Sequence, residues 1–341
     1  MLTCFRVSKS TFYNFLSTRQ LTKFSSNRIG ILGAPFRRGQ PKKGVEEAPD
    51  ALRKHGLLSQ LQLLGLDVKD YKNLSFEGGL ECSTNHKLKY TSTVAAACEK
   101  VSEAVKNILL DGRKCVTIGG DHSLGMGTVH GHSQVHDVCL LWIDAHADIN
   151  TSQTTPSGNF HGMSCSFLLK ELHKYNSFLP EFKWLNPCLD KCNLAYIGLR
   201  DIDPGEKLIL KKENILHFTM QEVDKLGIYE VTQRALEAIN PLGNLSLHVS
   251  FDIDSIDKLI APSTGTPVHG GLTVREILSI AEEVSKVDSF RALDIVEVNP
   301  LLGNEQQVLQ TLDVATLAIK AFLGDKRQES FKKELQHIPL A

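Results

Sequence analysis

The 341-residue chain is predicted to be an α/β protein whose parallel sheet is covered by helices on both faces. Short apolar runs alternate with segments of helical periodicity along most of the chain, which is typical of strand–helix–strand units. Several runs, such as "VCLLWI" (138–143), are apolar at consecutive positions, as strands buried on both faces require. No internal repeat or shift in composition marks a linker, so one domain is predicted.

The predicted elements alternate in order along the chain. Strands are expected at 30–36, 114–120, 138–144, 194–200, 245–254 and 291–300. Helices are expected near 94–110, 123–134, 162–174, 221–239, 273–287 and 305–322. The weakly patterned stretch 72–92 is interpreted as a surface loop, and the charged segment 325–341 as a C-terminal tail.

Composition is that of a water-soluble globular protein, with 42% hydrophobic residues, 23% charged residues and a formal net charge of −1. This balance argues against nucleic acid or an anionic membrane surface as the main partner. No apolar run approaches the ~18 residues of a membrane span. The eight cysteines are scattered without C-x-x-C pairs, which predicts a reducing compartment and no disulfide framework.

The first 27 residues differ from the rest of the chain. They contain four basic residues, Arg6, Lys9, Arg19 and Lys23, and many serines and threonines, and the first carboxylate of the chain is Glu46. An amphipathic, acid-poor segment of this kind is typical of a mitochondrial transit peptide. We therefore expect a mitochondrial protein; the alternative is a disordered basic arm on a cytoplasmic protein.

Polar clusters directly follow the predicted strands. They are "GGDHS" (119–123), "DAHADIN" (144–150), "SFDID" (250–254) and the single carboxylate Glu297. The carboxyl ends of parallel strands form the ligand crevice of open α/β sheets, so these clusters are expected to meet. In an extended backbone, residues i, i+2 and i+4 lie on one side, so Asp144, His146 and Asp148 are predicted to face a common point.

These clusters predict a site for two metal ions. Together with His122, Asp252 and Asp254, the alternating residues supply four carboxylates and two imidazoles. That is more than the three protein ligands of a catalytic zinc, and four buried negative charges require compensation. Oxygen-rich ligation without thiolate favours Mn²⁺ over Zn²⁺ or Mg²⁺, and two ions ~3.5–4 Å apart would share and deprotonate a water molecule. A helix cap or turn could explain one cluster, but not three.

Six motifs in order resemble the ureohydrolase family and, within it, the arginases. The motifs are "GGDHS", "DAHADIN", "SGNFHG", "GLRDIDPGE", "SFDID" and "EVNP", and "GAPFRRGQPKKGVEEAPDALR" (33–53) is also similar. The resemblance implies a three-layer α/β/α fold with a central parallel sheet and a catalytic domain at 28–324. It also implies that a hydroxide bridging two Mn²⁺ ions attacks the guanidinium carbon of L-arginine, giving L-ornithine and urea.

The resemblance also assigns the metal ligands. It places His122, Asp144, Asp148 and Asp252 on one ion of each subunit. On the other ion it places Asp144, His146, Asp252 and Asp254, so that Asp144 and Asp252 bridge the pair.

Catalytic roles implied by the family fall on His161, Glu297 and Asp148. A carboxylate such as Glu297 accepts paired hydrogen bonds from a planar guanidinium. An imidazole such as His161 can protonate a leaving amine near neutral pH.

Substrate contacts implied by the family come from loops. Neutral donors for the α-carboxylate are expected at Asn150, Thr155, Ser157 and Asn159. The α-amine contact is expected at Asp203, with Glu206 as a second candidate, and Thr266 is expected near the guanidinium.

The chain departs from the family pattern at a few positions. Ser255, Ile256 and Lys258 replace the more common Gly, Leu and Pro, which puts the local loop shape in doubt but leaves both aspartates in place. Pro156 stands where a threonine is frequent, and His269 stands where an apolar residue is common. We assign no role to His269.

Two further expectations concern assembly and rival functions. The family is usually homotrimeric, and "LTVREI" (272–277) resembles its intersubunit segment, with Arg275 and Glu276 as candidates for ion pairs. The alternatives are an agmatinase-like ureohydrolase, a deacetylase-like zinc amidohydrolase and a catalytically silent binding subunit. The last should have lost a ligand, Glu297 or His161, and none is missing.

Overall fold

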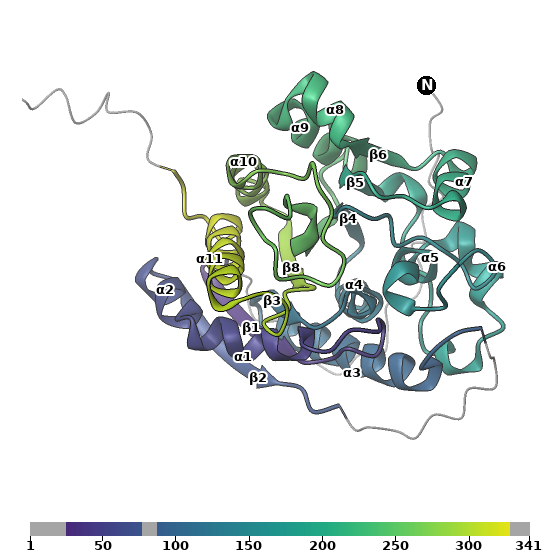
Figure 1. The fold of residues 1–341 in the computed structure, drawn as a ribbon, viewed down its shortest axis with the longest axis horizontal. Coiled ribbons are helices and arrows are strands. Elements are labelled where there is room, and N and C mark those ends of the chain that lie inside the picture. Colours follow the sequence, from purple (N-terminus) through teal and green to yellow (C-terminus); the bar gives the residue numbers. More distant parts are fainter. Residues whose placement is uncertain (1–24, 77–86, 328–341) are drawn as a thin grey trace, which may run out of the picture.

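The computed structural model describes residues 25–76 and 87–327, which form one eight-stranded parallel sheet between two layers of helices (Figure 1). The predicted three-layer α/β/α fold is therefore confirmed. The strand order is β2-β1-β3-β8-β7-β4-β5-β6. Most of the expected transit peptide (1–27) and of the tail (325–341) lies outside the described residues.

All six predicted strands are present, and the sheet has two more at its edges. The strands are β1 Arg28–Ala34, β2 Asp67–Asn73, β3 Lys114–Gly119, β4 Val138–Ile143, β5 Leu194–Leu199, β6 Leu216–Thr219, β7 Ser246–Asp252 and β8 Phe290–Val296. Sequence patterning missed β2 and β6 because an edge strand pairs on one side only. Neither needs a continuous apolar run: β2, "DVKDYKN", has no fully buried residue.

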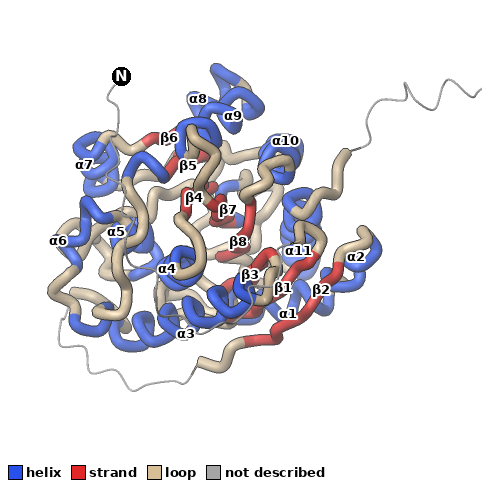
Figure 2. The backbone as a smooth tube through the Cα atoms, turned by 180° about the vertical axis from the view of Figure 1, so that it is seen from behind, coloured by secondary structure: helices blue, strands red, loops and turns tan. Residues whose placement is uncertain are grey.

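Helices cover both faces of the sheet (Figure 2). One layer contains α1 Ala48–Lys54, α2 Leu57–Leu63, α8 Met220–Leu226, α9 Ile228–Ile239, α10 Val274–Ser285 and α11 Glu305–Phe322. The other contains α3 Thr91–Leu110, α4 Gly125–Ser133, α5 Ser164–Leu168, α6 His173–Asn176 and α7 Pro204–Glu213. Short 3-10 helices are Val45–Glu47, His122–Leu124, Phe160–Met163, Lys170–Leu172, Pro180–Phe182, Lys191–Asn193 and Ile253–Ser255.

Several helix predictions were wrong in detail. The expected single helix at 162–174 is a series of short α and 3-10 segments, and the one at 221–239 is divided at Gly227, whose φ of 78° is outside the helical region. The helices α1, α2 and α7 were not predicted. Of the expected loop at 72–92, residues 72–73 belong to β2 and 91–92 to α3, and 77–86 lie outside the described residues.

Neither a membrane-spanning helix nor a disulfide is found in the part of the chain that the structure describes. No helix there has both the length and the apolar character needed to cross a bilayer. The six cysteines described there are all free of disulfides.

Candidate metal centre and active site

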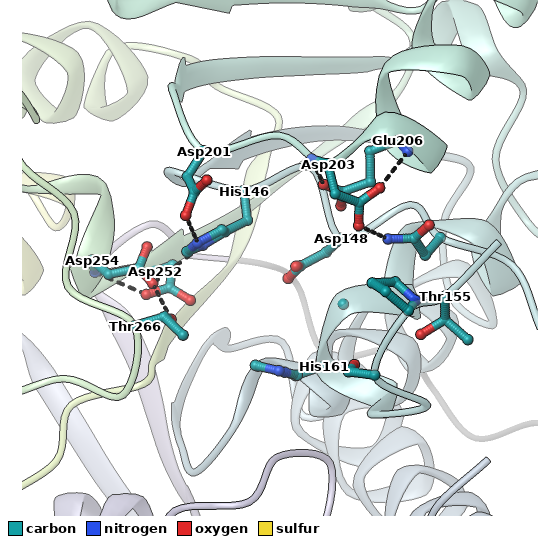
Figure 3. A pocket seen from close by; sticks show the side chains of 14 residues that line it. His146, Asp148, Thr155, His161, Asp201, Asp203, Glu206, Asp252, Asp254 and Thr266 are labelled. Carbon is teal, nitrogen blue, oxygen red and sulfur yellow. Dashed lines mark hydrogen bonds and ion pairs between the residues drawn. The ribbon is translucent and has the colours of Figure 1, made fainter. Parts of the chain in front are cut away.

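The polar clusters meet at the carboxyl edge of the sheet, as predicted, around a cavity of about 200 Å³ (Figure 3). Loops after β3, β4, β5, β7 and β8 all contribute residues to this edge. The cavity is lined by His146, Asp148, Asn150, Thr155, Pro156, Ser157, His161, Gly162, Asp201, Asp203, Glu206, Asp252, Asp254 and Thr266.

The backbone after β4 is bent, so the predicted extended alternation of Asp144, His146 and Asp148 was wrong. The strand ends at Ile143, residues 144–146 form a bend, and Asp148 has a φ of 49°. The Ala145 carbonyl accepts the N–H groups of two residues from the loop after β5, at 2.9 and 3.0 Å. The three side chains therefore converge because of a tertiary contact that turns the chain.

The first group of potential ligands surrounds His122. Its Nδ1 atom lies 3.0 Å from Asp144 Oδ2, 3.2 Å from Asp148 Oδ2 and 3.1 Å from Asp252 Oδ2. The His122 ring stacks on Trp142 with centroids 3.9 Å apart and planes 8° from parallel. The Trp142 indole also donates to Asp144 Oδ2 at 2.9 Å, so one side chain orients two potential ligands.

The second group shares Asp144 with the first. His146 Nδ1 lies 3.3 Å from both Asp144 Oδ1 and Asp254 Oδ2, and Asp254 also accepts a hydrogen bond from Thr266 at 2.9 Å. The potential ligand atoms of His122, Asp144 and Asp252 lie within 4.8 Å of one another, and so do those of Asp144, His146 and Asp254. Asp252 belongs to the first group only, so its bridging role stays a prediction.

These residues fit a pair of divalent cations. His122 Nδ1 and Asp254 Oδ1 are buried and have no hydrogen-bond partner. Burial, with the charges of Asp254 and Asp144, raises the pKa of Asp252 well above its usual value. Burial and Asp144 raise the pKa of Asp148 to about 6. Buried carboxylates that lie this close together repel one another when all of them are ionised. Bound cations would remove this repulsion and so stabilise the ionised carboxylates.

Glu297 lies next to His161. The distance between Glu297 Oε1 and His161 Nδ1 is 3.4 Å, and Glu297 Oε1 also accepts the His122 N–H at 2.9 Å. Burial lowers the pKa of His161, but the carboxylates of Glu297, Asp148 and Asp121 together outweigh it and the net shift is upward. Glu297 is buried at 2% exposure and is not among the residues that line the cavity.

The expected substrate loops lie at the other side of the cavity. Asn150 Nδ2 donates to Asp203 Oδ2 at 2.5 Å. Asp203 is also the N-cap of α7 and forms a capping box with Glu206. Burial and the charge of Asp148 raise the pKa of Glu206 to about 8. Asp203 thus lines the cavity and also caps α7. Glu206 accepts the Asp203 N–H at 3.1 Å through Oε2 and the Ile149 N–H, from the loop after β4, at 3.4 Å through Oε1.

The recognition loop 150–159 is only partly brought to the cavity. Thr155, Pro156 and Ser157 line it, whereas Asn159 is buried outside the lining and donates its N–H to Ser157 Oγ at 3.2 Å. The unusual Ser255 is accommodated because its hydroxyl donates to the Asp252 carbonyl at 2.7 Å. This contact links the loop after β7, which differs from the family pattern, to the backbone of a potential metal ligand.

Sequence reasoning missed several residues of the site. Asp201 lies 3.6 Å from His146 Nε2, and Arg200 donates to the carbonyls of Asp254 (2.6 Å) and Ser255 (3.1 Å), clamping that loop. Both stand inside "GLRDIDPGE", so the motif could have pointed to them. Asp121, inside "GGDHS", accepts the Gly39 N–H at 2.8 Å, and the Gly39 carbonyl accepts the His161 N–H at 3.0 Å.

Comparison with known proteins identifies the family. The arginase family profile matches residues 27–323, which include every residue of the site described above. The chain belongs to the arginase family. Its sequence is 46% identical over 306 residues to "Arginase-1" of Bos taurus, covering 89% of this chain and 95% of the relative. It is 45% identical over 307 residues to "Arginase-2, mitochondrial" of Rattus norvegicus, covering 89% and 87%.

Solved arginase structures have the same fold. The native arginase of Bacillus caldovelox superposes with a TM-score of 0.81 at 32% identity, covering 88% of this chain and 99% of that one. The Bacillus cereus arginase superposes with a TM-score of 0.78 at 33% identity, covering 88% and 100%. The predicted fold and the predicted enzyme class, a ureohydrolase of the arginase family, are confirmed.

Proposed function

We propose that this arginase-family chain hydrolyses L-arginine to L-ornithine and urea at a centre holding two Mn²⁺ ions per subunit. The observation that carries the proposal is the pair of overlapping His/Asp groups at the carboxyl edge of the sheet, which share Asp144. The unpartnered His122 Nδ1 and Asp254 Oδ1 supply lone pairs in this cluster. Carboxylate-rich ligation with imidazole suits Mn²⁺.

The proposed ligands are those of the sequence analysis. His122, Asp144, Asp148 and Asp252 would hold one ion, and Asp144, His146, Asp252 and Asp254 the other. When bound, the ions would lower the pKa of a water molecule and so supply a nucleophile near neutral pH.

Glu297 is proposed to orient the guanidinium group. Its carboxylate is held in place because Oε1 accepts the His122 N–H at 2.9 Å. A fixed carboxylate can accept paired N–H groups and so align the guanidinium carbon. His161, 3.4 Å away, is proposed to protonate the departing amine.

The far side of the cavity is proposed to select the amino-acid end of the substrate. Asn150, Thr155 and Ser157 offer neutral donors for an α-carboxylate, Asn159 supports Ser157, and Asp203 offers a charge for the α-amine. Agmatine has no carboxylate and would leave these donors unused. The buried Glu206 is proposed to hold Asp203 rather than to contact substrate directly.

Urea release tests this proposal. Purified protein should release urea from L-arginine, should do so poorly from agmatine, and should lose the activity on chelation and regain it with Mn²⁺. Preference for agmatine would assign the chain to the agmatinase-like alternative. No release from either substrate by protein that binds two Mn²⁺ ions would support the catalytically silent alternative.

Location and assembly are proposed on separate grounds. The acid-poor N-terminus (1–27) supports import into mitochondria, and relatives from rat and human are named "Arginase-2, mitochondrial". A homotrimer is proposed from the family resemblance. Arg275 is exposed, whereas the Glu276 carboxylate caps α10. Light scattering of the Arg275→Ala variant should therefore show weakened association, and an unchanged mass would count against this contact.

A further inference from the structure

We propose that the buried carboxylate of Asp121 positions His161 by holding the backbone of Gly39, to which the backbone of His161 is hydrogen-bonded. These three residues are called the Gly39 link below. The inference rests on the proposed function, in which His161 protonates the departing amine. Asp121 and Gly39 do not line the cavity, so Asp121 is a positioning residue and not a catalytic one.

The backbone of His161 is held by a distant loop. His161 lies in the 3-10 helix Phe160–Met163, whose N-cap residue Asn159 makes no side-chain hydrogen bond to the helix. The N–H groups at a helix start have no partner within the helix and need acceptors from elsewhere. The His161 N–H donates to the Gly39 carbonyl at 3.0 Å. Because Gly39 belongs to the loop after β1, that loop fixes the start of the helix that contains His161.

Asp121 holds Gly39 on its other side. The Asp121 side chain is 0% exposed, and its Oδ2 accepts the Gly39 N–H at 2.8 Å. Its Oδ1 accepts the Ser123 N–H at 3.0 Å and also the Ser123 hydroxyl, at the start of the 3-10 helix His122–Leu124. Both oxygens therefore accept hydrogen bonds, and the carboxylate is fixed in the direction of Gly39.

The loop after β1 packs directly against the segment that contains Asp121. A Cβ atom on Gly39 would lie 2.3 Å from Asp121 Oδ1 and 2.6 Å from Ser123 Cβ. A Cβ atom on Gly120 would lie 1.8 Å from the Phe36 carbonyl oxygen, and that carbonyl accepts the Asp121 N–H at 2.9 Å. Since no side chain separates the two segments, a shift of the Asp121 carboxylate also shifts Gly39.

The Gly39 link controls the distance between His161 and Glu297. His161 Nδ1 lies 3.4 Å from Glu297 Oε1, which accepts the His122 N–H at 2.9 Å. Adjacent residues thus anchor Glu297 directly, through His122, and His161 indirectly, through Gly39. Proton transfer needs a heavy-atom distance of about 2.6 to 3.2 Å, and a misplacement of about 1 Å can lower a rate 100-fold. Asp121 can therefore affect amine protonation without contacting the substrate.

Asp121→Asn tests the Gly39 link because an asparagine side chain has one acceptor oxygen. That oxygen can still cap Ser123, but the amide NH₂ then faces the Gly39 N–H and cannot accept it. The maximum kcat for urea release from L-arginine between about pH 7 and pH 10 should fall about tenfold, because His161 is displaced. KM and the Mn²⁺ content should stay at their wild-type values.

Two further variants accompany Asp121→Asn. Ser123→Ala removes the hydroxyl contact of the same carboxylate but keeps the Gly39 contact, so its kcat should equal that of the wild type. Asp121→Ser also keeps one N-cap oxygen and loses the second, so its kcat should fall as in Asp121→Asn. Melting temperatures identify folded variants, and Asp121→Ser provides the same comparison if Asp121→Asn does not fold.

A double-mutant cycle shows whether Asp121 acts through His161. In the His161→Ala background no imidazole remains to be positioned, so adding Asp121→Asn should leave the residual kcat unchanged. An equal fall in kcat in both backgrounds would overturn the Gly39 link, and so would a loss of Mn²⁺ or an unchanged maximum kcat in Asp121→Asn.

The pH profile separates position from charge. The Asp121 carboxylate contributes to the raised pKa of His161, so loss of its charge alone would shift the profile to lower pH and leave its maximum unchanged. That result would overturn the Gly39 link. The proposed function would stand in every one of these cases, because it depends on the wild type binding two Mn²⁺ ions and releasing urea from L-arginine.

Discussion

Glu297 has a left-handed backbone (φ 60°) at the position where β8 ends. This conformation is uncommon for a non-glycine residue and is often kept where side-chain direction serves function. The Glu297 N–H donates to the Gly120 carbonyl at 2.9 Å. The Glu297 carboxylate accepts the N–H of His122, which lies two residues after Gly120 in the loop that follows β3. The residue thus links the ends of β3 and β8 and places a carboxylate beside His161.

Replacing Glu297 with glutamine should reduce kcat/KM for L-arginine by about 100-fold, because the neutral amide offers one acceptor and no charge to the guanidinium. The amide oxygen of the new side chain can still accept the His122 N–H, so the melting temperature should stay near that of the wild type. Steady-state urea assays measure the effect. Wild-type kcat/KM in this variant would show that Glu297 does not orient the substrate.

Lys114 is a buried charge far from the site, at the amino end of β3. Burial, and then Arg291, lower its pKa from 10.5 to about 8, and its Nζ lies 4.2 Å from the Phe290 ring centroid. Below pH 8 both folded and unfolded chains are protonated, and the charge destabilises the fold. As pH rises from about 8 to 10.5 the folded chain is deprotonated first, so this cost falls.

Lys114→Met should therefore raise the free energy of unfolding at pH 7 by about 1 to 3 kcal/mol, since one pKa unit corresponds to ~1.4 kcal/mol. The gain should shrink as pH rises above 8. Urea denaturation at pH 7 and pH 9.5 measures both effects, with the exposed Lys183→Met as control. A loss of stability at pH 7 would show that the contact with Phe290 outweighs desolvation.

At the scale of elements, α7 connects helix capping to substrate recognition. It begins with Pro204 at the first helical position and a capping box between Asp203 and Glu206. The same Asp203 carboxylate accepts from Asn150 and lines the cavity. A helix terminus therefore fixes the position of a proposed substrate contact.

Two variants of Asp203 separate these roles. Asp203→Asn keeps an N-cap oxygen but loses the negative charge proposed to contact the α-amine of the substrate. The KM for L-arginine should therefore rise by about tenfold, which corresponds to a loss of ~1.4 kcal/mol in binding free energy. Asp203→Ala should show the same KM effect and should also destabilise the protein by about 1 kcal/mol. Kinetics and urea denaturation measure the two effects. An unchanged KM in both variants would leave Asp203 with the capping role only.

At the scale of the whole molecule, the site joins loops from five strands at one edge of the sheet. Its buried carboxylates repel one another unless cations are present, so metal binding and folding stability are coupled. Chelation should lower the melting temperature, and saturating Mn²⁺ at 100 to 1,000 times its Kd should restore about 3 to 4 kcal/mol of stability.

The size of this Mn²⁺ effect should depend on pH. In the metal-free protein the pKa values of Asp252 and Asp148 are raised, the latter to about 6, so the folded chain takes up protons more readily than the unfolded chain. The metal-free form should gain stability as pH falls through 6, and Mn²⁺ should bind less well there. Calorimetry at pH 7.5 and 5 should show a smaller Mn²⁺ shift at pH 5; a larger one would contradict this electrostatic account.

The sequence by itself determined the central strands and the polar clusters at their ends. A strand buried on both faces must be apolar at nearly every position, and parallel strands must end at one edge, so β3, β4, β7 and β8 and their ligand types could be predicted. The metal-ligand pattern was also visible because carboxylates and imidazoles are costly to bury without a cation.

Only the tertiary structure decided how these residues meet. The bend after Ile143 depends on Ala145 accepting bonds from the loop after β5, and the polar edge strand β2 is a strand because β1 pairs with it. Ser250 and Asp294 look like ordinary strand residues until their register places them beneath His122. The periodicity of apolar residues in the sequence indicates how deeply each segment is buried. Which distant side chains come into contact depends on strand order, register and the paths of the loops.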